Sequence, residues 1–211
     1  MSDVRRLAAA TVVAALSLVG VSSCQGGHDK PASNGTPTEA STPLESLSTE
    51  GLVVQRDAFC SGIGPHALQD ALGGSDYHGT SYNNGDPARL TAGTKDVAHE
   101  FDCTWQTTDG TVARAWVFAP PVRRVQAKQL AKASLRPHCA AAKGPQFGAP
   151  SVSTRCETPK TVEDGYFGLF GDAWLSGTLT ARKPEPADLT ERTSRWCAAV
   201  VKAASGQTPE N

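Results

Sequence analysis

The clearest alternation of apolar and polar positions lies between residues 99 and 119, in two strand-like runs on either side of Asp109-Gly110. An Asp-Gly pair favours a two-residue type I′ turn between antiparallel strands. Because side chains alternate between the two faces of a strand, that turn predicts one aromatic, buried face and one small or polar face. The buried face would hold the facing pairs Phe101–Phe118, Cys103–Trp116, Trp105–Arg114 and Thr107–Val112.

Three other segments have helical signals. Pro65 begins a short run of apolar residues that Gly73-Gly74 closes, which predicts a helix between them. A second helix is predicted from Val122 to about Leu135. Asp188 is placed to cap a terminal helix whose apolar residues recur at helical spacing, and Gly206 is placed to end it.

The remaining patterned segments are strands. A strand is predicted from Ser151 to Cys156, and two more between Gly165 and Ala181 with a turn near Gly171-Asp172. Residues 73–93 are rich in Gly, Asn, Asp and Ser, and they are predicted to form a long loop. A hairpin, further strands and a few helices predict a single α+β domain, with an antiparallel sheet packed against two or three helices.

The N-terminus has the order of a secretory signal. Arg5-Arg6 is followed by an uncharged, Ala-, Val- and Leu-rich run from Leu7 to Val21. That run is too short to span a bilayer comfortably, since a helix needs about 20 residues, but it suits a signal peptide. It ends in Val21-Ser22-Ser23-Cys24, which resembles the bacterial lipobox. The resemblance implies that Cys24 carries a diacylglycerol and becomes the mature N-terminus; the alternative is an ordinary signal peptide cleaved nearby.

Gln25–Glu50 has no aromatic residue and is rich in Gly, Pro, Ser and Thr. Such a segment cannot bury enough apolar surface to offset chain entropy, so a disordered tether is predicted. The expected organisation is therefore a signal peptide over 1–23, the lipidated Cys24 and tether over 24–50, a domain over 51–205, and a flexible tail over 206–211.

Five cysteines remain in the domain, and an exported protein is expected to form disulfides. Fifteen two-bridge arrangements are possible, and the spacing alone does not choose among them. The arrangement we favour joins Cys60 to Cys103, which points into the core under a covering segment, and Cys139 to Cys156. Cys197 then remains a free thiol in the apolar stripe of the last helix. A thiol in such a place is normally inert, although a nucleophile or an intermolecular bridge is the alternative.

The formal net charge is -1, with 20 basic and 21 acidic side chains, which argues against nucleic-acid binding. The charge is nevertheless uneven: residues 111–156 contain eight basic residues and no Asp or Glu. Arg124, Lys128, Lys132 and Arg136 recur every four residues and would form one stripe on the predicted helix. The stripe is a candidate patch for an anionic partner, such as acidic lipid headgroups or wall polymers. The alternative is a solvated face balanced by acidic residues elsewhere.

Motifs for catalysis or cofactor binding are absent from the sequence. His99-Glu100-Phe101-Asp102-Cys103 begins like the HExxH zinc motif, but Cys103 replaces its second His and the segment is a predicted strand. The sequence has no GxSxG, P-loop or CxxC motif. No metal or cofactor is therefore expected, and we favour a protein that is not an enzyme.

The mature domain resembles actinobacterial lipoproteins of uncharacterised families. The residues that carry the resemblance are Cys24, the pair Cys60 and Cys103, the run Cys103-Thr104-Trp105, and the segment from Gly168 to Trp174. The resemblance implies a lipid-anchored location at the outer face of the cell membrane and a disulfide-stabilised architecture, not a reaction.

Three hypotheses for function follow. The first is a lipid-anchored binding or accessory domain, which predicts a concave apolar site with few polar groups or a patch formed by the basic stripe. The second is a hydrolase whose site joins distant residues, with His78 or His99 beside a carboxylate and a hydroxyl. The third is a structural, envelope-assembly protein without a small-molecule pocket.

Overall fold

The computed structural model describes residues 41–91 and 94–206. The predicted signal peptide, Cys24, most of the predicted tether and the end of the predicted tail lie outside these residues. Those expectations therefore remain predictions.

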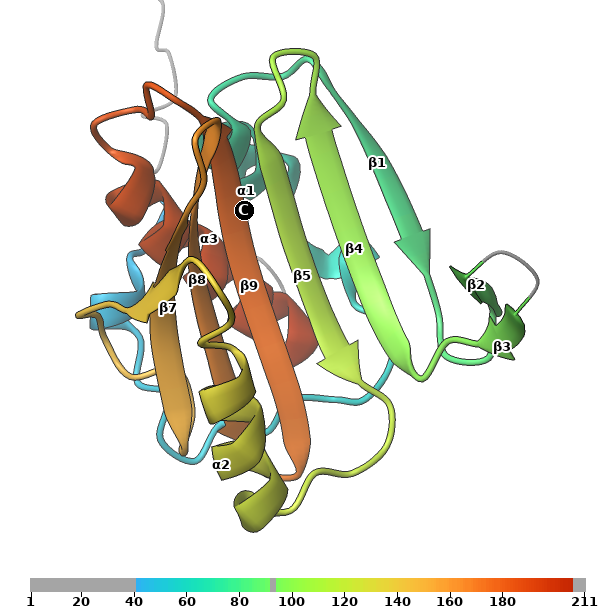
Figure 1. Cartoon of the computed structure of the whole chain (residues 1–211). Coiled ribbons are helices and arrows are strands. Elements are labelled where there is room, and N and C mark those ends of the chain that lie inside the picture. The colour runs from blue at the N-terminus through green and yellow to red at the C-terminus, as the bar shows by residue number, and fades with distance from the viewer. Residues whose placement is uncertain (1–40, 92–93, 207–211) are drawn as a thin grey trace, which may run out of the picture. The chain divides into compact units, whose positions relative to one another are not determined.

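The described residues form one antiparallel sheet of seven strands, which Figure 1 shows face on. The strands run in spatial order as β1 (Tyr77–Tyr82), β4 (Glu100–Thr107), β5 (Val112–Phe118), β9 (Ala173–Arg182), β8 (Thr161–Phe170), β7 (Ser151–Glu157) and β6 (Cys139–Ala141). A separate small hairpin of β2 (Pro87–Thr91) and β3 (Thr94–Val97) projects beyond the end of β1 (Figure 1). The domain is therefore built around a single sheet.

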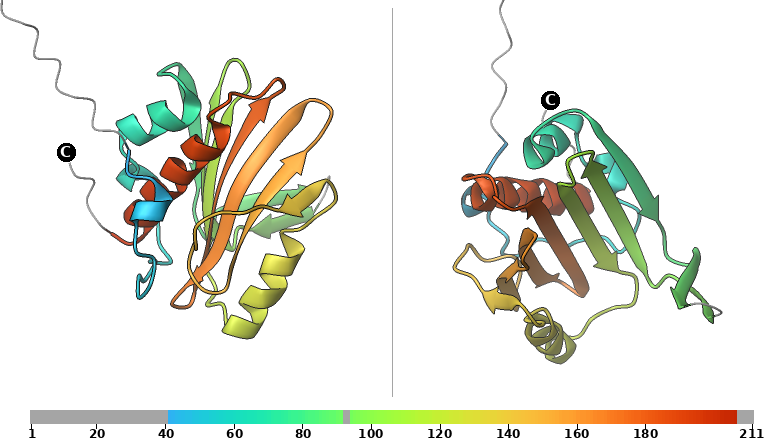
Figure 2. Two further views of the ribbon diagram at one scale, coloured as in Figure 1. Left: turned by 90° about the vertical axis from the view of Figure 1, so that its left-hand side faces the viewer. Right: turned by 45° about the horizontal axis from the view of Figure 1, so that its top comes forward.

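Helices cover the two faces of the sheet unequally. α1 (Pro65–Leu72) and α3 (Leu189–Ala204) lie on one face, and α2 (Arg124–Ala133) lies on the other (Figure 2). Two short 3-10 turns, η1 (Leu44–Ser46) and η2 (Cys60–Gly62), complete the α3 side. The α+β class, the antiparallel sheet and the packing of helices against it are as the sequence predicts.

The core has two parts, because the sheet is apolar on both faces. The larger part fills the space between the sheet and α1 and α3, and it includes Trp196, Leu175 and Leu179. The smaller lies under α2, where Ala127 packs with Phe167 and other side chains. Among the described residues, the buried core residues fall between Leu44 and Ala204.

The β4–β5 hairpin is shifted by one residue from the predicted register. Phe101 pairs with Val117, and Cys103 pairs with Ala115. The reason is a three-residue loop: Gly110 adopts φ of 90°, and the backbone hydrogen bond from Thr107 N to Thr111 O closes the hairpin at 3.0 Å. A positive-φ glycine after a tight turn is typical of such loops.

Because a shift of one residue reverses the faces of a strand, the predicted aromatic face is wrong for β5. Ala113, Ala115 and Val117 point into the main core, and Arg114 and Trp116 point to the opposite face.

Two other predictions are corrected. Residues 73–93 are not a continuous loop, because β1 pairs along the edge of the sheet with β4. Most of the β1 side chains are exposed, so the strand has little apolar alternation to reveal it. The predicted tether extended too far, because Leu44 is 1% exposed and its N–H donates to Ser194 Oγ at 3.0 Å. One buried leucine anchors a segment that otherwise has a tether-like composition.

Both favoured disulfides are present, Cys60–Cys103 and Cys139–Cys156. The first joins η2 to β4 and fastens the covering segment to the sheet. The second joins directly opposite residues of β6 and β7. Cys197 is free and completely buried, and its Sγ lies 3.4 Å from the Gly177 carbonyl oxygen. Burial raises the pKa of the Cys197 thiol well above its usual value, so the reactive thiolate does not form at neutral pH.

The buried thiol predicts the labelling behaviour of the protein with Cys24→Ala. A maleimide should add to no cysteine of the folded protein, and to one after denaturation without reductant, as counted by mass spectrometry. Rapid labelling of the folded protein would show that Cys197 is accessible. More than one label after denaturation would show that a disulfide is missing.

A close backbone crossing on β8 places the loop that precedes β7. A Cβ atom on Gly168 would lie 1.5 Å from the carbonyl oxygen of Phe147, so only glycine lets the loop lie this close. Phe147 is fully buried there and packs edge-on against Phe170, with ring centroids 5.1 Å apart. The loop from 145 to 149 therefore has one position on the sheet.

Gly168→Ala should lower the free energy of unfolding by about 3 kcal/mol, because the added methyl forces the loop and the strand apart. Gly74→Ala is the matched control. No atom lies within 4 Å of the added methyl at Gly74, so its effect should stay within about 0.5 kcal/mol. Urea unfolding of both variants measures the difference, and equal stabilities would contradict the close crossing.

Candidate functional site

A cleft of about 1130 Å³ lies at the end of the sheet where β8 turns into β9. Four segments line it: residues 44–53 before the first helix, residues 121–124 at the start of α2, residues 145–149 before β7, and residues 169–172 at the β8–β9 turn. The cleft is therefore built from parts of the chain that are far apart in sequence.

Helix α3 and the loop before β7 hold the N-terminal wall of the cleft in place. Ser194 of α3 accepts a hydrogen bond from Leu44 N and donates one to Glu45 Oε2 at 2.7 Å. At the other end, Gln55 N donates to the carbonyl of Ala204 at 2.8 Å. In between, Thr49 Oγ1 donates to the Gln146 carbonyl at 3.2 Å. A segment without a long helix or a strand is thus fixed by hydrogen bonds to α3 and to the loop before β7.

The opposite wall is tied to the β8–β9 turn. Val122 N donates to the Asp172 carbonyl at 2.7 Å, just before α2 begins. The Arg56 guanidinium bridges the two sides, since it pairs with the Asp172 carboxylate at 3.2 Å and donates to the Ala119 carbonyl at 2.8 Å. These contacts set the position of the first turn of α2 relative to the cleft.

The lining combines apolar surface with charge. Its apolar residues are Leu44, Leu47, Leu52, Val53, Pro121, Val122, Pro145, Leu169 and Phe170. Val53 is 62% exposed, although the next residue, Val54, is buried. Arg123 and Arg124 lie at the α2 side, and neither makes an ion pair within the described residues. The Nε of Arg123 donates to Gln126 Oε1 at 3.4 Å. The lining also includes three acidic residues: Glu45 accepts from Ser194, Asp172 pairs with Arg56, and Glu50 is exposed. The cleft thus offers an apolar surface with the two arginines on its α2 side.

The predicted basic stripe divides in the structure. Arg124, Lys128 and Lys132 lie on α2, are exposed and make no ion pair with any described residue. Arg136 lies beyond the end of the helix, where its guanidinium pairs with Glu163 of β8. Three of the four predicted patch residues therefore remain available to a partner, and the fourth is engaged by the fold.

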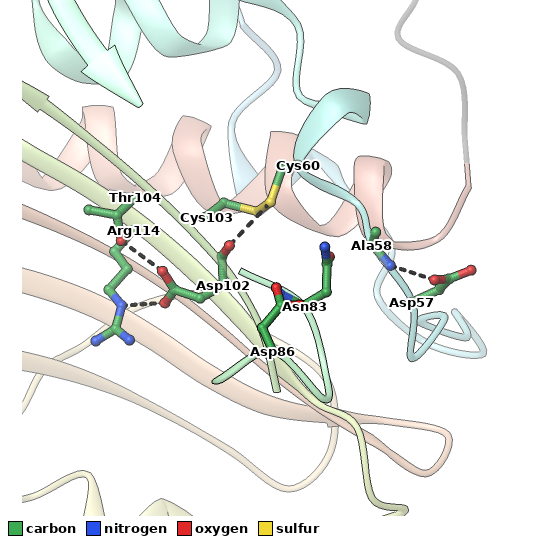
Figure 3. Close-up of a disulfide and its surroundings, with 9 residues drawn as sticks. All are labelled: Asp57, Ala58, Cys60, Asn83, Asp86, Asp102, Cys103, Thr104 and Arg114. Atoms are coloured by element: carbon green, nitrogen blue, oxygen red, sulfur yellow. Dashed lines mark hydrogen bonds and ion pairs between the residues drawn. A yellow bond between two sulfur atoms is a disulfide. The ribbon is translucent and has the colours of Figure 1, made fainter. Parts of the chain in front are cut away.

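The sheet face beyond α2 carries a second polar cluster, centred on Asp102 (Figure 3). The buried carboxylate of Asp102 accepts from Arg114 Nε at 2.5 Å and from Thr104 Oγ1 at 2.9 Å. Although burial opposes the charged form, the Asp102 carboxylate raises the pKa of Arg114. Close by, Tyr82 donates to Glu100, and burial together with this hydrogen bond raises the pKa of Tyr82.

The Asp102 cluster has a structural role. Asp102 lies directly beside Cys103, and Cys60 Sγ is 3.3 Å from the Asp102 carbonyl oxygen (Figure 3). Arg114 compensates the negative charge of the Asp102 side chain close to the point where the disulfide joins the sheet. A buried carboxylate needs such a partner. The Arg114 guanidinium is thus already paired with Asp102.

The histidines do not form a catalytic group. His78 and His99 are both exposed, and in the described ranges neither makes a side-chain hydrogen bond. His66 Nδ1 lies 3.4 Å from Ser41 Oγ, a contact without a carboxylate. The hydrolase hypothesis therefore gains no support from the part of the chain that the structure covers.

Residues 41–91 and 94–206 contain neither a metal-binding cluster nor a membrane-spanning helix. No group of three or more His, Cys, Asp or Glu side chains is placed to hold a metal ion. No helix in the same ranges has the length and apolar character needed to cross a membrane.

Comparison with known proteins gives little. No family model matches the chain, and no curated protein matches it. A crystal structure of a GTP-binding regulator from Thermotoga maritima matches with a TM-score of 0.33 and 10% sequence identity, over 67% of this chain and 87% of that one. A likeness this remote says nothing about the function of the chain.

The cleft itself could not be predicted from the sequence, because residues 44–50 of its wall have the composition of a tether. The spacing of Leu44, Leu47 and Leu52 was the one available signal that this segment packs against the domain. The loop from 145 to 149 carried no signal of its position, which depends on the glycine at 168.

Proposed function

We propose that the chain is a lipid-anchored binding domain at the outer face of the cell membrane, with its ligand site in the cleft beside α2. The observation that carries the proposal is the cleft, which is large enough for a small ligand and is partly lined by apolar residues. Arg123 and Arg124 lie beside this apolar surface, and their guanidinium groups have no ion-pair partner among the described residues. A concave, partly apolar site with a few charged groups is typical of small-ligand binding.

The lining favours an amphiphile that carries an acidic group. Side chains such as Leu47, Leu52 and Val53 offer contact to an apolar body. The two arginines offer charge-assisted hydrogen bonds to a carboxylate or phosphate, which are stronger than neutral ones. A purely apolar ligand would leave the arginines unused, and a small polar ion would leave most of the cleft empty.

The N-terminal sequence supports the lipid anchor. Arg5-Arg6, the apolar run and Cys24 occur in the order that lipoprotein signals have. Leu44, the first residue of the cleft wall, lies 20 residues after Cys24. Twenty residues reach at most about 70 Å even when fully extended, so an anchored domain would keep its cleft close to the membrane.

Cys24→Ala should move the protein from the membrane fraction to the soluble extracytoplasmic fraction, because it removes the only thiol that the lipobox would modify. Ser23→Ala keeps a small residue before the cysteine and should leave the protein in the membrane fraction. Fractionation with an antibody measures both. The anchor proposal fails if the Cys24→Ala protein stays in the membrane fraction or still incorporates labelled fatty acid.

Ligand binding in the cleft is tested with a fluorescent long-chain fatty acid and the corresponding neutral alcohol. Arg123→Gln/Arg124→Gln should weaken binding of the acid by about tenfold, as expected for the loss of a charge-assisted contact worth about 1.4 kcal/mol, and leave alcohol binding unchanged. Val53→Glu should weaken binding of both probes, because it places a charge on the apolar wall.

The matched control is Lys128→Gln/Lys132→Gln, which removes the same charge from α2 outside the cleft. It should bind the fatty acid as the unmodified protein does. Equal losses in the two double variants would show that net charge, rather than the cleft, determines binding. No measurable binding of either probe would remove the cleft as a site for amphiphiles.

A further inference from the structure

Helix α2 presents an unusual outward face. Successive helical residues are rotated by about 100°, so Val125, Lys128 and Lys132 fall within about 60° of one another. The same arithmetic places them roughly opposite Ala127, which is fully buried against the sheet. The outward face of α2 is therefore formed by two lysines and a valine, with Arg124 at its border.

The fold does not neutralise this face. Arg124, Lys128 and Lys132 make no ion pair with a described residue, although the domain has ion pairs at many other positions. The sequence from 111 to 156 contains no Asp or Glu, so no acidic neighbour in the chain accompanies the helix. Like charges four residues apart also destabilise a helix slightly, so this spacing does not serve the stability of α2.

The apolar residues on the same side distinguish between anionic partners. Val125 is 70% exposed and Leu135, just after the helix, is 41% exposed. A soluble polyanion would contact only the basic groups. A lipid surface also takes up apolar side chains at the level of the headgroups, which is the usual arrangement for interfacial helices.

We propose that the outward face of α2 docks the domain onto an anionic lipid bilayer. This proposal rests on the proposed function, which places the domain at the membrane. It adds the orientation of the domain relative to the bilayer. Because α2 begins at Arg124 and Arg123 directly precedes it, docking would bring the α2 side of the cleft next to the lipid headgroups. An acidic amphiphile could then pass between the bilayer and the cleft without crossing water.

The experiment uses the exported chain, residues 24–211, with Cys24→Ala, so that no lipid anchor contributes. This chain keeps every residue of the core. Flotation measures its binding to vesicles of phosphatidylcholine with one third phosphatidylglycerol, and to vesicles of phosphatidylcholine alone. We expect binding to the anionic vesicles that falls as salt is raised, and little binding to the neutral ones.

Lys128→Gln/Lys132→Gln should weaken binding to the anionic vesicles by about 30-fold, from roughly fivefold for each basic residue near such a surface. Lys160→Gln/Lys202→Gln is the matched control. It removes the same charge from residues that make no ion pair in the described ranges and lie away from α2, and it should change binding by less than about twofold. Thermal unfolding checks that both variants are folded.

Val125→Ser separates a bilayer from a polyanion. It should weaken vesicle binding by roughly fivefold, because about one methylene equivalent no longer enters the interface. Binding to soluble polyphosphate should be weak and unaffected. The docking proposal is overturned if the double lysine variant binds vesicles normally, or if polyphosphate binds as tightly as vesicles do and Val125→Ser has no effect. Either result leaves the cleft and anchor tests intact, because those tests are decided by the variants of Arg123, Arg124, Val53 and Cys24.

Discussion

Helix α3 lies directly against the central strand β9 because Gly177 has no side chain at the point of contact. A Cβ atom at Gly177 would lie 2.7 Å from Cys197 Sγ, which is inside contact distance. The small thiol and the glycine fit together, and Trp196 fills the adjoining space with its Nε1 hydrogen-bonded to the Arg114 carbonyl at 3.3 Å. Close packing of this kind leaves α3 one position on the sheet. The positions of other elements of the domain depend on the position of α3.

The hydrogen bonds and ion pairs of α3 then organise the surrounding chain. Arg195 holds Asp70 of α1 through two hydrogen bonds of 2.7 and 3.0 Å, and Arg192 donates to the final carbonyls of the same helix, Asp70 and Ala71. Ser194 and Ala204 hold the segment that begins at Leu44. The N-terminal wall of the cleft is therefore a consequence of where α3 sits, although the two lie some 150 residues apart.

This dependence explains which features the sequence could predict. Helices α1 and α3 are predictable because the spacing of their apolar residues is a local signal, and so are the glycines that follow them, Gly73 and Gly206. The favoured disulfides were right because each joins a strand to its immediate cover or neighbour. The β4–β5 register could not be predicted because Asp109-Gly110 is compatible with both a two-residue and a three-residue loop. The backbone conformation of Gly110 distinguishes the two loops. The cleft was missed because its walls meet through contacts to α3 and across Gly168, which no local pattern encodes.

The distribution of charge singles out the same part of the domain as the cleft does, the side around α2. On the α3 side, one cluster of charged groups is paired: Arg155 bridges Asp164 and Glu185, and Thr190 also donates to Asp164. Asp102 and Arg114 satisfy each other on the open part of the sheet. The ion pairs of the domain do not involve Arg124, Lys128 or Lys132, so these three basic residues of α2 contribute none of the charge pairing that holds the fold. Such a helix costs a little stability through self-repulsion. The proposed anionic partner outside the fold would offset this repulsion and give the basic residues beside the cleft a role.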